Sequence, residues 1–123
     1  MRILIAGGPK CGKTTFAATL GLAVRHTDDL IGTMSWSDVS DHVASRWMML
    51  PGEWCIEGVA VARAIRKWLD ANANGKPADR VYHMPEAKIE LDARQEGMRK
   101  SCLTVFNEIR PELMARGCLI ITK

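Results

Sequence analysis

Residues 2–15 constrain this chain more than any other part of its sequence. The stretch begins with the apolar residues 3–6, whose composition is that of a buried β-strand. Residues 7–14 follow and match the pattern G-x-x-x-x-G-K-T without exception. Residues 14–22 are rich in alanine and carry apolar side chains at helical spacing. The sequence therefore predicts a strand, a glycine-rich loop and a helix in direct succession.

This order of residue types is typical of a loop that binds the phosphates of a nucleotide. Glycines permit a positive φ and bring backbone N–H groups close to a phosphate, and the start of the next helix adds the positive end of its dipole. Lys13 has the length and charge to reach the β- and γ-phosphates, and the hydroxyl of Thr14 is a ligand for Mg²⁺. We therefore expect ATP, or another nucleoside triphosphate, bound with Mg²⁺. The residues expected to hold it are Gly7, Gly8, Pro9, Lys10, Cys11, Gly12, Lys13, Thr14 and Thr15.

Composition is that of an ordinary globular domain. The 123 residues suffice for one domain with a core, and 47% are hydrophobic and 25% charged. No apolar stretch is long enough to span a bilayer and the first strand follows Met1 directly, so we expect a cytoplasmic protein with no membrane partner. The four cysteines show no C-x-x-C pair and no histidine at ligand spacing, which argues against zinc. The net charge of +3 permits a polyanionic partner without requiring one.

Acidic residues come at the ends of two further predicted strands. Residues 25–31 are interpreted as a short second strand with Asp28 and Asp29 at its end, and residues 54–58 as a third strand with Glu57 near its end. Ligands of open α/β sheets gather outside the carboxyl ends of strands, so these carboxylates are candidates for the site. Asp28 could accept the proton of an acceptor hydroxyl or hold Mg²⁺, and the alternative is a helix cap or a solvated turn. Asp29 and Glu57 could orient the substrate, and Glu57 could instead bond only to the backbone of its turn.

Arginines on two predicted helices are candidates for binding an acceptor phosphate. The apolar spacing predicts a helix over residues 37–50, with Trp36 on the loop before it and Arg46 partly off its apolar face. A second helix is predicted over residues 59–70, and Arg63 lies one turn from its start.

A small lid-like segment is predicted at about residues 85–100. It follows a fourth strand over residues 79–84 and includes Asp92, which forms a capping box with Gln95. Arg94 lies on the apolar face of the next helix, where a lid could bring its charge to a transferring phosphoryl group. The alternative is that Arg94 extends into solvent.

The last part of the sequence indicates where the final helix is interrupted and where a fifth strand lies. Pro111 is predicted to break or kink the helix that Asp92 opens, and residues 118–122 form a fifth strand. Strands that alternate with helices predict a single α/β domain over residues 1–123, with three α/β/α layers around a five-stranded parallel sheet.

The pattern resembles the P-loop kinases that are built on the nucleoside monophosphate kinase fold. The resemblance is specific at residues 7–14, which are similar to a Walker A motif. It extends to Asp28-Asp29, to Glu57-Gly58 with Arg63, and to residues 94–100, which match in order the acceptor-site acid, the third strand end and the arginine lid. The resemblance implies the sheet order 2-3-1-4-5 and a Mg²⁺-dependent phosphotransferase.

The leading hypothesis is transfer of the γ-phosphate of ATP to a hydroxyl, such as the 5′-hydroxyl of a polynucleotide or nucleoside. The polynucleotide kinases that the chain resembles carry an acid soon after the second strand, in a stretch similar to residues 27–30. Lys13, Asp28 and Arg94 would be catalytic, and Thr14 and Asp28 would lie at the metal.

Two alternatives stay open. In a nucleoside monophosphate kinase, Arg46, Arg63 and Arg94 would grip an acceptor phosphate, although adenylate-type kinases usually end the third strand in Asp-Gly where this chain has Glu57-Gly58. In a nucleotide-gated binding module, the chain would hydrolyse slowly or not at all and would act through a partner.

Overall fold

Apolar stretches of the chain form one parallel sheet. The computed structural model describes residues 1–123, and its five strands are ordered β2-β3-β1-β4-β5. This order is the predicted one, and every neighbouring pair is parallel, as was also predicted. The strands are β1 (Arg2–Ala6), β2 (Val24–His26), β3 (Trp54–Gly58), β4 (Arg80–His83) and β5 (Leu119–Thr122). The helices are α1 (Lys13–Ala18), α2 (Trp36–Ser45), α3 (Val61–Ala71) and α4 (Ala93–Ala115), with short 3-10 helices η1 (Thr27–Asp29) and η2 (Trp47–Met49).

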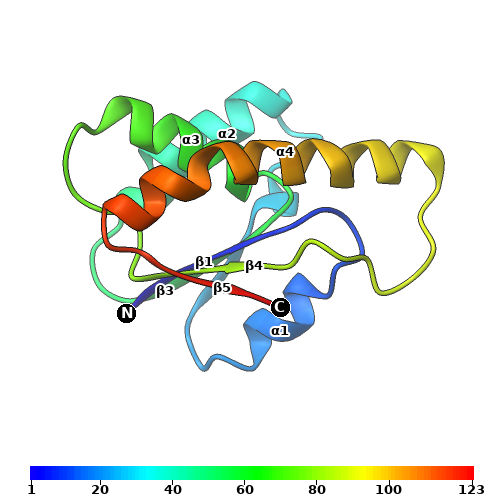
Figure 1. Cartoon of the computed structure of the whole chain (residues 1–123), viewed down its shortest axis with the longest axis horizontal. Coiled ribbons are helices and arrows are strands. Elements are labelled where there is room, and N and C mark those ends of the chain that lie inside the picture. Colours follow the sequence, from blue (N-terminus) through cyan, green and yellow to red (C-terminus); the bar gives the residue numbers. More distant parts are fainter.

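Helices flank both faces of the sheet. Figure 1 shows α2, α3 and α4 over one face and α1 alone over the other. Side chains of β1 alternate between these faces, because Leu4 packs in the core under α2–α4 whereas Ile3 and Ile5 pack in the smaller core beside α1. The structure is therefore an α/β protein with an all-parallel sheet, compatible with the predicted three layers. None of its helices combines the length and apolar composition needed to cross a bilayer.

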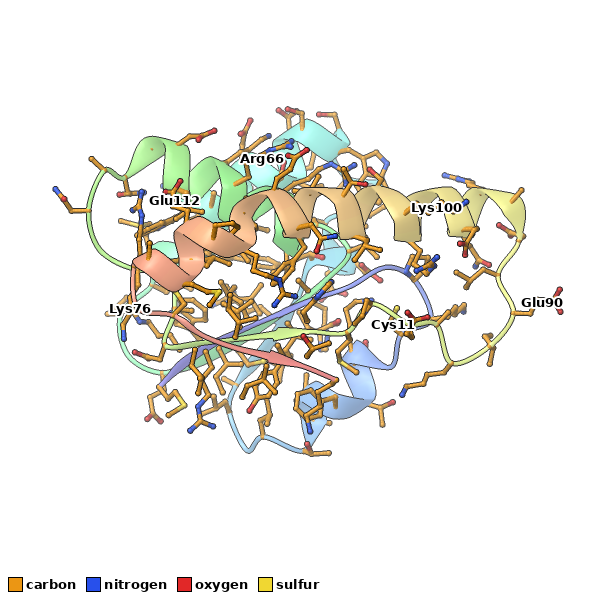
Figure 2. All side chains as sticks on the ribbon, viewed as in Figure 1. Cys11, Arg66, Lys76, Glu90, Lys100 and Glu112 are labelled. Atoms are coloured by element: carbon orange, nitrogen blue, oxygen red, sulfur yellow. The ribbon has the colours of Figure 1, made fainter.

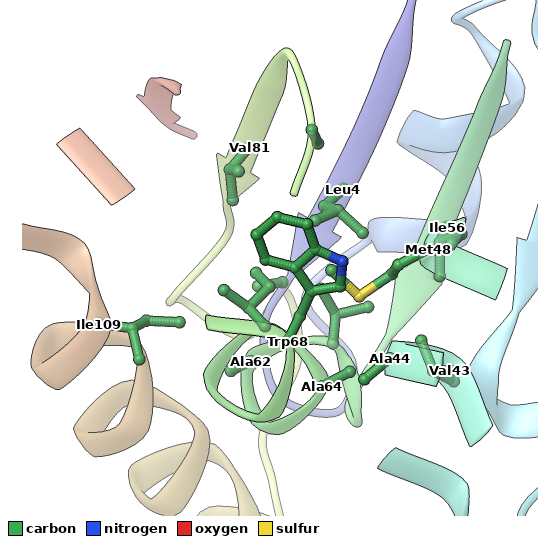
Figure 3. Packing of buried hydrophobic residues seen from close by; sticks show 14 of the residues in the cluster. Leu4, Val43, Ala44, Met48, Ile56, Ala62, Ala64, Trp68, Val81 and Ile109 are labelled. Carbon is green, nitrogen blue, oxygen red and sulfur yellow. The ribbon is translucent and has the colours of Figure 1, made fainter. Parts of the chain in front are cut away.

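The larger core is centred on α3. Figure 3 shows Trp68 of α3 among side chains from the sheet and the neighbouring helices, including Leu4, Met48 and Ile109. Small residues on the same helix leave room for this packing, since Ala64 is fully buried. The core thus fixes α2 and α4 relative to the carboxyl ends of β1 and β3, where the loops of interest emerge.

The second strand is shorter than predicted. It ends at His26, and Thr27–Asp29 forms a 3-10 turn instead of continuing the strand to residue 31. Leu30 N donates to Thr27 O at 3.0 Å, which closes the turn. The predicted acids therefore follow the strand end and do not lie within the strand.

Helix boundaries differ from the predictions at three places. The helix over residues 14–22 is only Lys13–Ala18, because Thr19 Oγ1 donates to Phe16 O at 2.7 Å and Gly21 adopts φ 72°. The helix over residues 59–70 begins two residues later, at Val61.

The helix over residues 37–50 begins earlier and ends earlier. Ser35 is its N-cap and accepts from Asp38 N at 3.1 Å, so Trp36 is its first residue and does not lie on a loop. It ends at Ser45, and the chain continues into η2.

Pro111 does not break α4, which runs for 23 residues. Proline lacks a backbone N–H and removes one helical hydrogen bond. Ile109 and Leu113 on either side of it are buried against the core, and their packing holds the helix together. The capping box of Asp92 with Gln95 is confirmed at its start, with Gln95 N donating to Asp92 Oδ1 at 2.8 Å.

Candidate functional site

The glycine-rich loop between β1 and α1 is held by close backbone contacts. A Cβ atom on Gly7 would overlap Met84 O, and one on Gly8 would lie 2.7 Å from Arg99 Cα. Gly12 adopts φ 83°, in the left-handed region. The predicted positive φ therefore holds for Gly12 but is wrong for Gly7 and Gly8, where glycine is needed for space.

Lys13 places a buried positive charge inside this loop. The residue is only 7% exposed, and its ammonium group donates to Gly8 O. It takes part in none of the ion pairs of the chain. An ammonium group has three donors, and a buried charge without a counter-charge is costly. The loop therefore holds a positive charge that no acidic side chain neutralises.

A buried carboxylate connects α1 to the strand ends. Glu57, near the end of β3, is 2% exposed. Its Oε1 accepts a hydrogen bond from Thr14 Oγ1 at 3.1 Å and lies 2.6 Å from His26 Nδ1. The alternative that Glu57 bonds only to the backbone of its turn is wrong, because both of these bonds join it to side chains.

One cavity opens beside the loop, and a second cavity adjoins the first. The first encloses about 450 Å³, and the second about 410 Å³. The first brings together the loop, α1 and residues from four other places in the chain. Its lining is Pro9, Lys10, Cys11, Gly12, Lys13, Thr14, Thr15, Asp28, Ile31, Trp36, Glu57, Val59, Arg94 and Met98. The second is lined by Trp36, Val59, Arg63, Arg94, Gly97, Met98, Ser101 and Cys102.

Most of the predicted site residues meet at these cavities. Asp28, Glu57 and Arg94 line the first cavity together with the loop. Arg63 lines the second cavity and donates to the hydroxyl of Ser101. Arg94 lines both, so the cavities are neighbours.

Four predicted residues line neither cavity, and two of them, Gly7 and Gly8, lie at the start of the loop itself. Asp29 is exposed in η1 and lines neither cavity. Arg46 is exposed at the C-cap of α2 and likewise lines neither. The expected substrate-binding roles of Asp29 and Arg46 therefore find no geometric support.

The segment after β4 covers the loop. Lys88 N donates to Lys10 O at 2.7 Å, and Lys88 Cε would lie 3.4 Å from a Cβ on Gly12. Arg99 donates to Pro85 O and pairs with Glu96 at 2.6 Å. The predicted lid-like segment is thus packed on the loop, and Lys88 adds positive charge beside it.

The cysteine of the loop is a packing residue in this geometry. Burial raises the pKa of the Cys11 thiol above its ordinary value, and the neighbouring Lys13 opposes this only in part. Burial also raises the pKa of Cys102 in the second cavity. Both thiols are therefore protonated at neutral pH and are poor nucleophiles.

The donor set fits Mg²⁺ that arrives with a nucleotide. No cluster of three or more His, Cys, Asp or Glu residues forms a complete metal site. Thr14 and Asp28 nevertheless place a hydroxyl and a carboxylate on the wall of the first cavity. Mg²⁺ commonly takes one or two protein oxygens together with phosphate oxygens and water, and a hydroxyl and a carboxylate are oxygen donors of this kind.

His26 is a site residue that the sequence motifs did not reveal, and Trp36, which was expected on the loop before α2, also lines the site. Trp36 is 41% exposed and lines both cavities. His26 is paired in register with Glu57 across β2 and β3. The sheet order predicted from the resemblance puts these strands side by side, so the histidine at one strand end and the glutamate at the other were the available signal.

No protein-family model and no curated protein sequence matches this chain. Its function must therefore be inferred from the residues of the site.

Proposed function

We propose that this chain is a Mg²⁺-dependent phosphotransferase of the P-loop kinase type, which moves the γ-phosphate of ATP or another nucleoside triphosphate to a hydroxyl. The observation that carries the proposal is the buried ammonium of Lys13, which has no counter-charge and lies on the wall of the first cavity. A triphosphate supplies the missing negative charge. The acceptor hydroxyl is the 5′-hydroxyl of a polynucleotide or nucleoside.

The loop and α1 bind the donor. Backbone N–H groups of residues 7–14 approach the phosphates, and Lys13 exchanges its bond with Gly8 O for a phosphate oxygen. Thr14 and Asp28 would hold Mg²⁺, with Asp28 acting through water so that its carboxylate stays free to accept a proton, and the ion would neutralise part of the charge of the phosphates. The cavity volume of about 450 Å³ is adequate for a bound nucleotide.

Asp28 and Arg94 serve the transfer step. The carboxylate of Asp28 accepts the proton of the acceptor hydroxyl while the oxygen of that hydroxyl forms a bond to the γ-phosphorus. The bond from that phosphorus to the β–γ bridging oxygen breaks, and the nucleoside diphosphate leaves. Arg94 neutralises charge on the transferring group, since its side chain lines the donor cavity and the neighbouring one. Positioning and charge stabilisation supply most of the rate enhancement in such reactions.

The second cavity is the place for the acceptor. It shares Trp36, Val59, Arg94 and Met98 with the first, so a molecule bound there lies next to the donor phosphates. Trp36 and Met98 offer an apolar surface for a flat ring, and stacking on an aromatic side chain is a common way to hold a base.

A nucleoside monophosphate kinase is the second candidate. Arg63 and Arg94 both line the second cavity, and two guanidinium groups are suited to an acceptor phosphate. In that reaction the acceptor is a phosphate oxygen, which needs no base, so Asp28 would only orient the nucleotide.

Transfer of labelled γ-phosphate to a panel of acceptors tests the proposal. The panel holds nucleosides, nucleoside monophosphates, and short DNA and RNA with 5′-hydroxyl ends. We expect label on the hydroxyl-bearing acceptors. Label on monophosphates alone favours the second candidate, and label only in free phosphate, or nowhere, favours a nucleotide-gated binding module.

Matched variants separate the roles of the residues. Lys13→Ala is expected to abolish transfer, whereas Lys76→Ala is expected to retain it, because Lys76 lies at the opposite end of the sheet from the loop residue Cys11 (Figure 2). Asp28→Asn is expected to lose at least about 100-fold in rate as a general base. Asp29→Asn changes the adjacent carboxylate outside both cavities and is expected to lose far less. Full turnover by Lys13→Ala would overturn the assignment.

A further inference from the structure

Three side chains from different elements meet at one oxygen atom. Glu57 Oε1 lies 2.6 Å from His26 Nδ1, at the end of β2, and 3.1 Å from Thr14 Oγ1, in the first turn of α1. A carboxylate only accepts hydrogen bonds. His26 therefore carries a proton on Nδ1 and donates it, and the hydroxyl of Thr14 donates its single proton as well.

The direction of that hydroxyl proton decides what Thr14 offers to the cavity. A hydroxyl group has one proton and two lone pairs. When the proton points to Glu57, the lone pairs of Oγ1 are free to bind a cation, and Thr14 lines the first cavity. If the proton turned toward the cavity instead, it would repel a metal ion.

Glu57 needs a second partner to hold this orientation. Its side chain has several rotatable bonds and is 2% exposed, where an unpaired carboxylate is costly. The bonds from His26 and Thr14 are the two side-chain hydrogen bonds that it accepts. The side chain of His26 is 36% exposed, whereas that of Glu57 is almost completely buried. Removal of His26 would leave Glu57 with one weaker bond and freedom to turn.

We propose that His26 is a positioning residue for the cation of the bound nucleotide, which it influences through Glu57 and Thr14. The inference rests on the proposed function and names a residue that the motif does not contain. A residue that orients a metal ligand without binding the metal itself typically contributes roughly 10–100-fold to the affinity for the metal.

Two substitutions separate the hydrogen bond from the packing of the ring. His26→Phe keeps a ring but removes the donor. His26→Asn removes the ring but keeps an N–H donor at the position of Nδ1. His42→Ala is the matched control, because His42 lies on α2, contacts Trp47 edge to face and lines neither of the two cavities.

The readout is binding, measured without turnover. Mn²⁺ replaces Mg²⁺ so that electron paramagnetic resonance reports free metal, with a non-hydrolysable ATP analogue as the nucleotide. For His26→Phe we expect Mn²⁺ affinity in the ternary complex to fall about tenfold. Affinity for the analogue in EDTA should stay at the wild-type value, His26→Asn should restore most of the Mn²⁺ affinity, and His42→Ala should match wild type.

A double-mutant cycle with Thr14→Ala tests whether His26 acts on the metal through Thr14. In the Thr14→Ala background, His26→Phe should cause no further loss of Mn²⁺ affinity, because the oxygen that it orients is gone. An undiminished further loss would overturn the inference, as would wild-type Mn²⁺ binding by His26→Phe, or an equal loss of nucleotide affinity with and without metal.

Folding and the underlying function are checked separately. Thermal unfolding of each free variant shows whether it is folded, and His26→Ala replaces His26→Phe if the phenyl ring is not accommodated. If wild type binds no nucleotide at all, the proposed function fails and this inference fails with it. If wild type binds the metal–nucleotide complex and His26→Phe binds it equally well, the positioning role alone is wrong.

Discussion

The backbone of Arg99 lies directly against Gly8, so that a methyl group on Gly8 would come within 2.7 Å of Arg99 Cα. The neighbouring Gly7 is similarly enclosed by Met84 O. The start of α4 and the glycine-rich loop are therefore in contact through main-chain atoms, which cannot move aside as a flexible side chain would.

Gly8→Ala is expected to push α4 and the loop apart. An extra methyl group in such a tight contact costs about 1–3 kcal/mol of stability, and it should also weaken binding of a nucleoside triphosphate. Gly97→Ala is the control, because a methyl group there meets nothing within 4 Å and should raise helix stability by about 0.5–1 kcal/mol. Urea unfolding and nucleotide titration measure both effects, and a Gly8→Ala protein with wild-type values would contradict the tight contact.

Thr27→Val should make the protein more stable. Thr27 is fully buried, and its Oγ1 has no hydrogen-bond partner. An unsatisfied buried hydroxyl costs about 1–3 kcal/mol, so removing it should gain about 1 kcal/mol even though valine differs slightly in shape. Thr104→Val removes an exposed hydroxyl that donates to Lys100 O at 3.0 Å and should give no such gain. An equal or lower stability of Thr27→Val in urea unfolding would contradict the prediction.

Stability should fall as the pH drops from about 6.5 to 4 because of His83. Burial, and to a smaller extent the Arg110 guanidinium, lower the pKa of His83 from 6.5 to about 4. Arg110 Nη2 lies 3.2 Å from His83 Nδ1 and donates to it, which requires a neutral ring. In this pH range the unfolded chain binds a proton that the folded chain does not, so stability is full above pH 6.5 and declines below it.

The variant His83→Asn isolates this contribution. Asparagine keeps an acceptor for Arg110 but does not titrate, so the fall in stability between pH 6.5 and 4 should be smaller than in wild type. Loss of the stacking on Phe106 lowers the stability of the variant at every pH, so the change with pH is the quantity to compare. Parallel pH profiles of the two proteins would mean that His83 does not cause the decline.

Asp92→Ala should loosen the first turn of α4. The Asp92 carboxylate accepts from Gln95 N at 2.8 Å, and the Gln95 side chain accepts from Asp92 N at 3.1 Å. Loss of such a cap costs about 1 kcal/mol, whereas Asp92→Asn should be nearly neutral because asparagine caps equally well. Hydrogen exchange at Arg94 to Met98 should speed up in Asp92→Ala, and unchanged exchange would mean that the contacts with the loop alone fix this turn.

The periodic and strongly patterned parts of the fold could be predicted from the sequence. The third strand was predicted with its correct bounds, since residues 54–58 are buried throughout and a glycine ends them. The start of α4 followed from its capping box. By contrast, the early end of α1 depends on a side-chain bond of Thr19, and the survival of α4 at Pro111 depends on packing of Ile109 and Leu113. Such tertiary contacts override local preference and leave no regular pattern.

The residues of the candidate site likewise include some that the sequence could indicate and some that it could not. Residues inside a motif, such as Lys13 and Thr14, were found from spacing alone. Asp28 and Glu57 were found because parallel strands end at one edge of the sheet. Arg46 was misplaced because its direction depends on where α2 ends, and helix ends are the least certain part of a periodic pattern. His26 lies outside every motif, and the one signal for it was its position beside Glu57 in the predicted pairing of β2 with β3.

The length of α4 links the hydrophobic core mechanically to the two cavities. At 1.5 Å per residue, its 23 residues form one rod about 35 Å long. Phe106, Ile109 and Leu113 anchor one half of the rod in the core, while Arg94 and Met98 on the other half line both cavities. A tilt of the anchored half is therefore transmitted along the helix to Arg94 and to the contact of Arg99 with Gly8, so that a core substitution far from the loop can misplace the guanidinium without touching it.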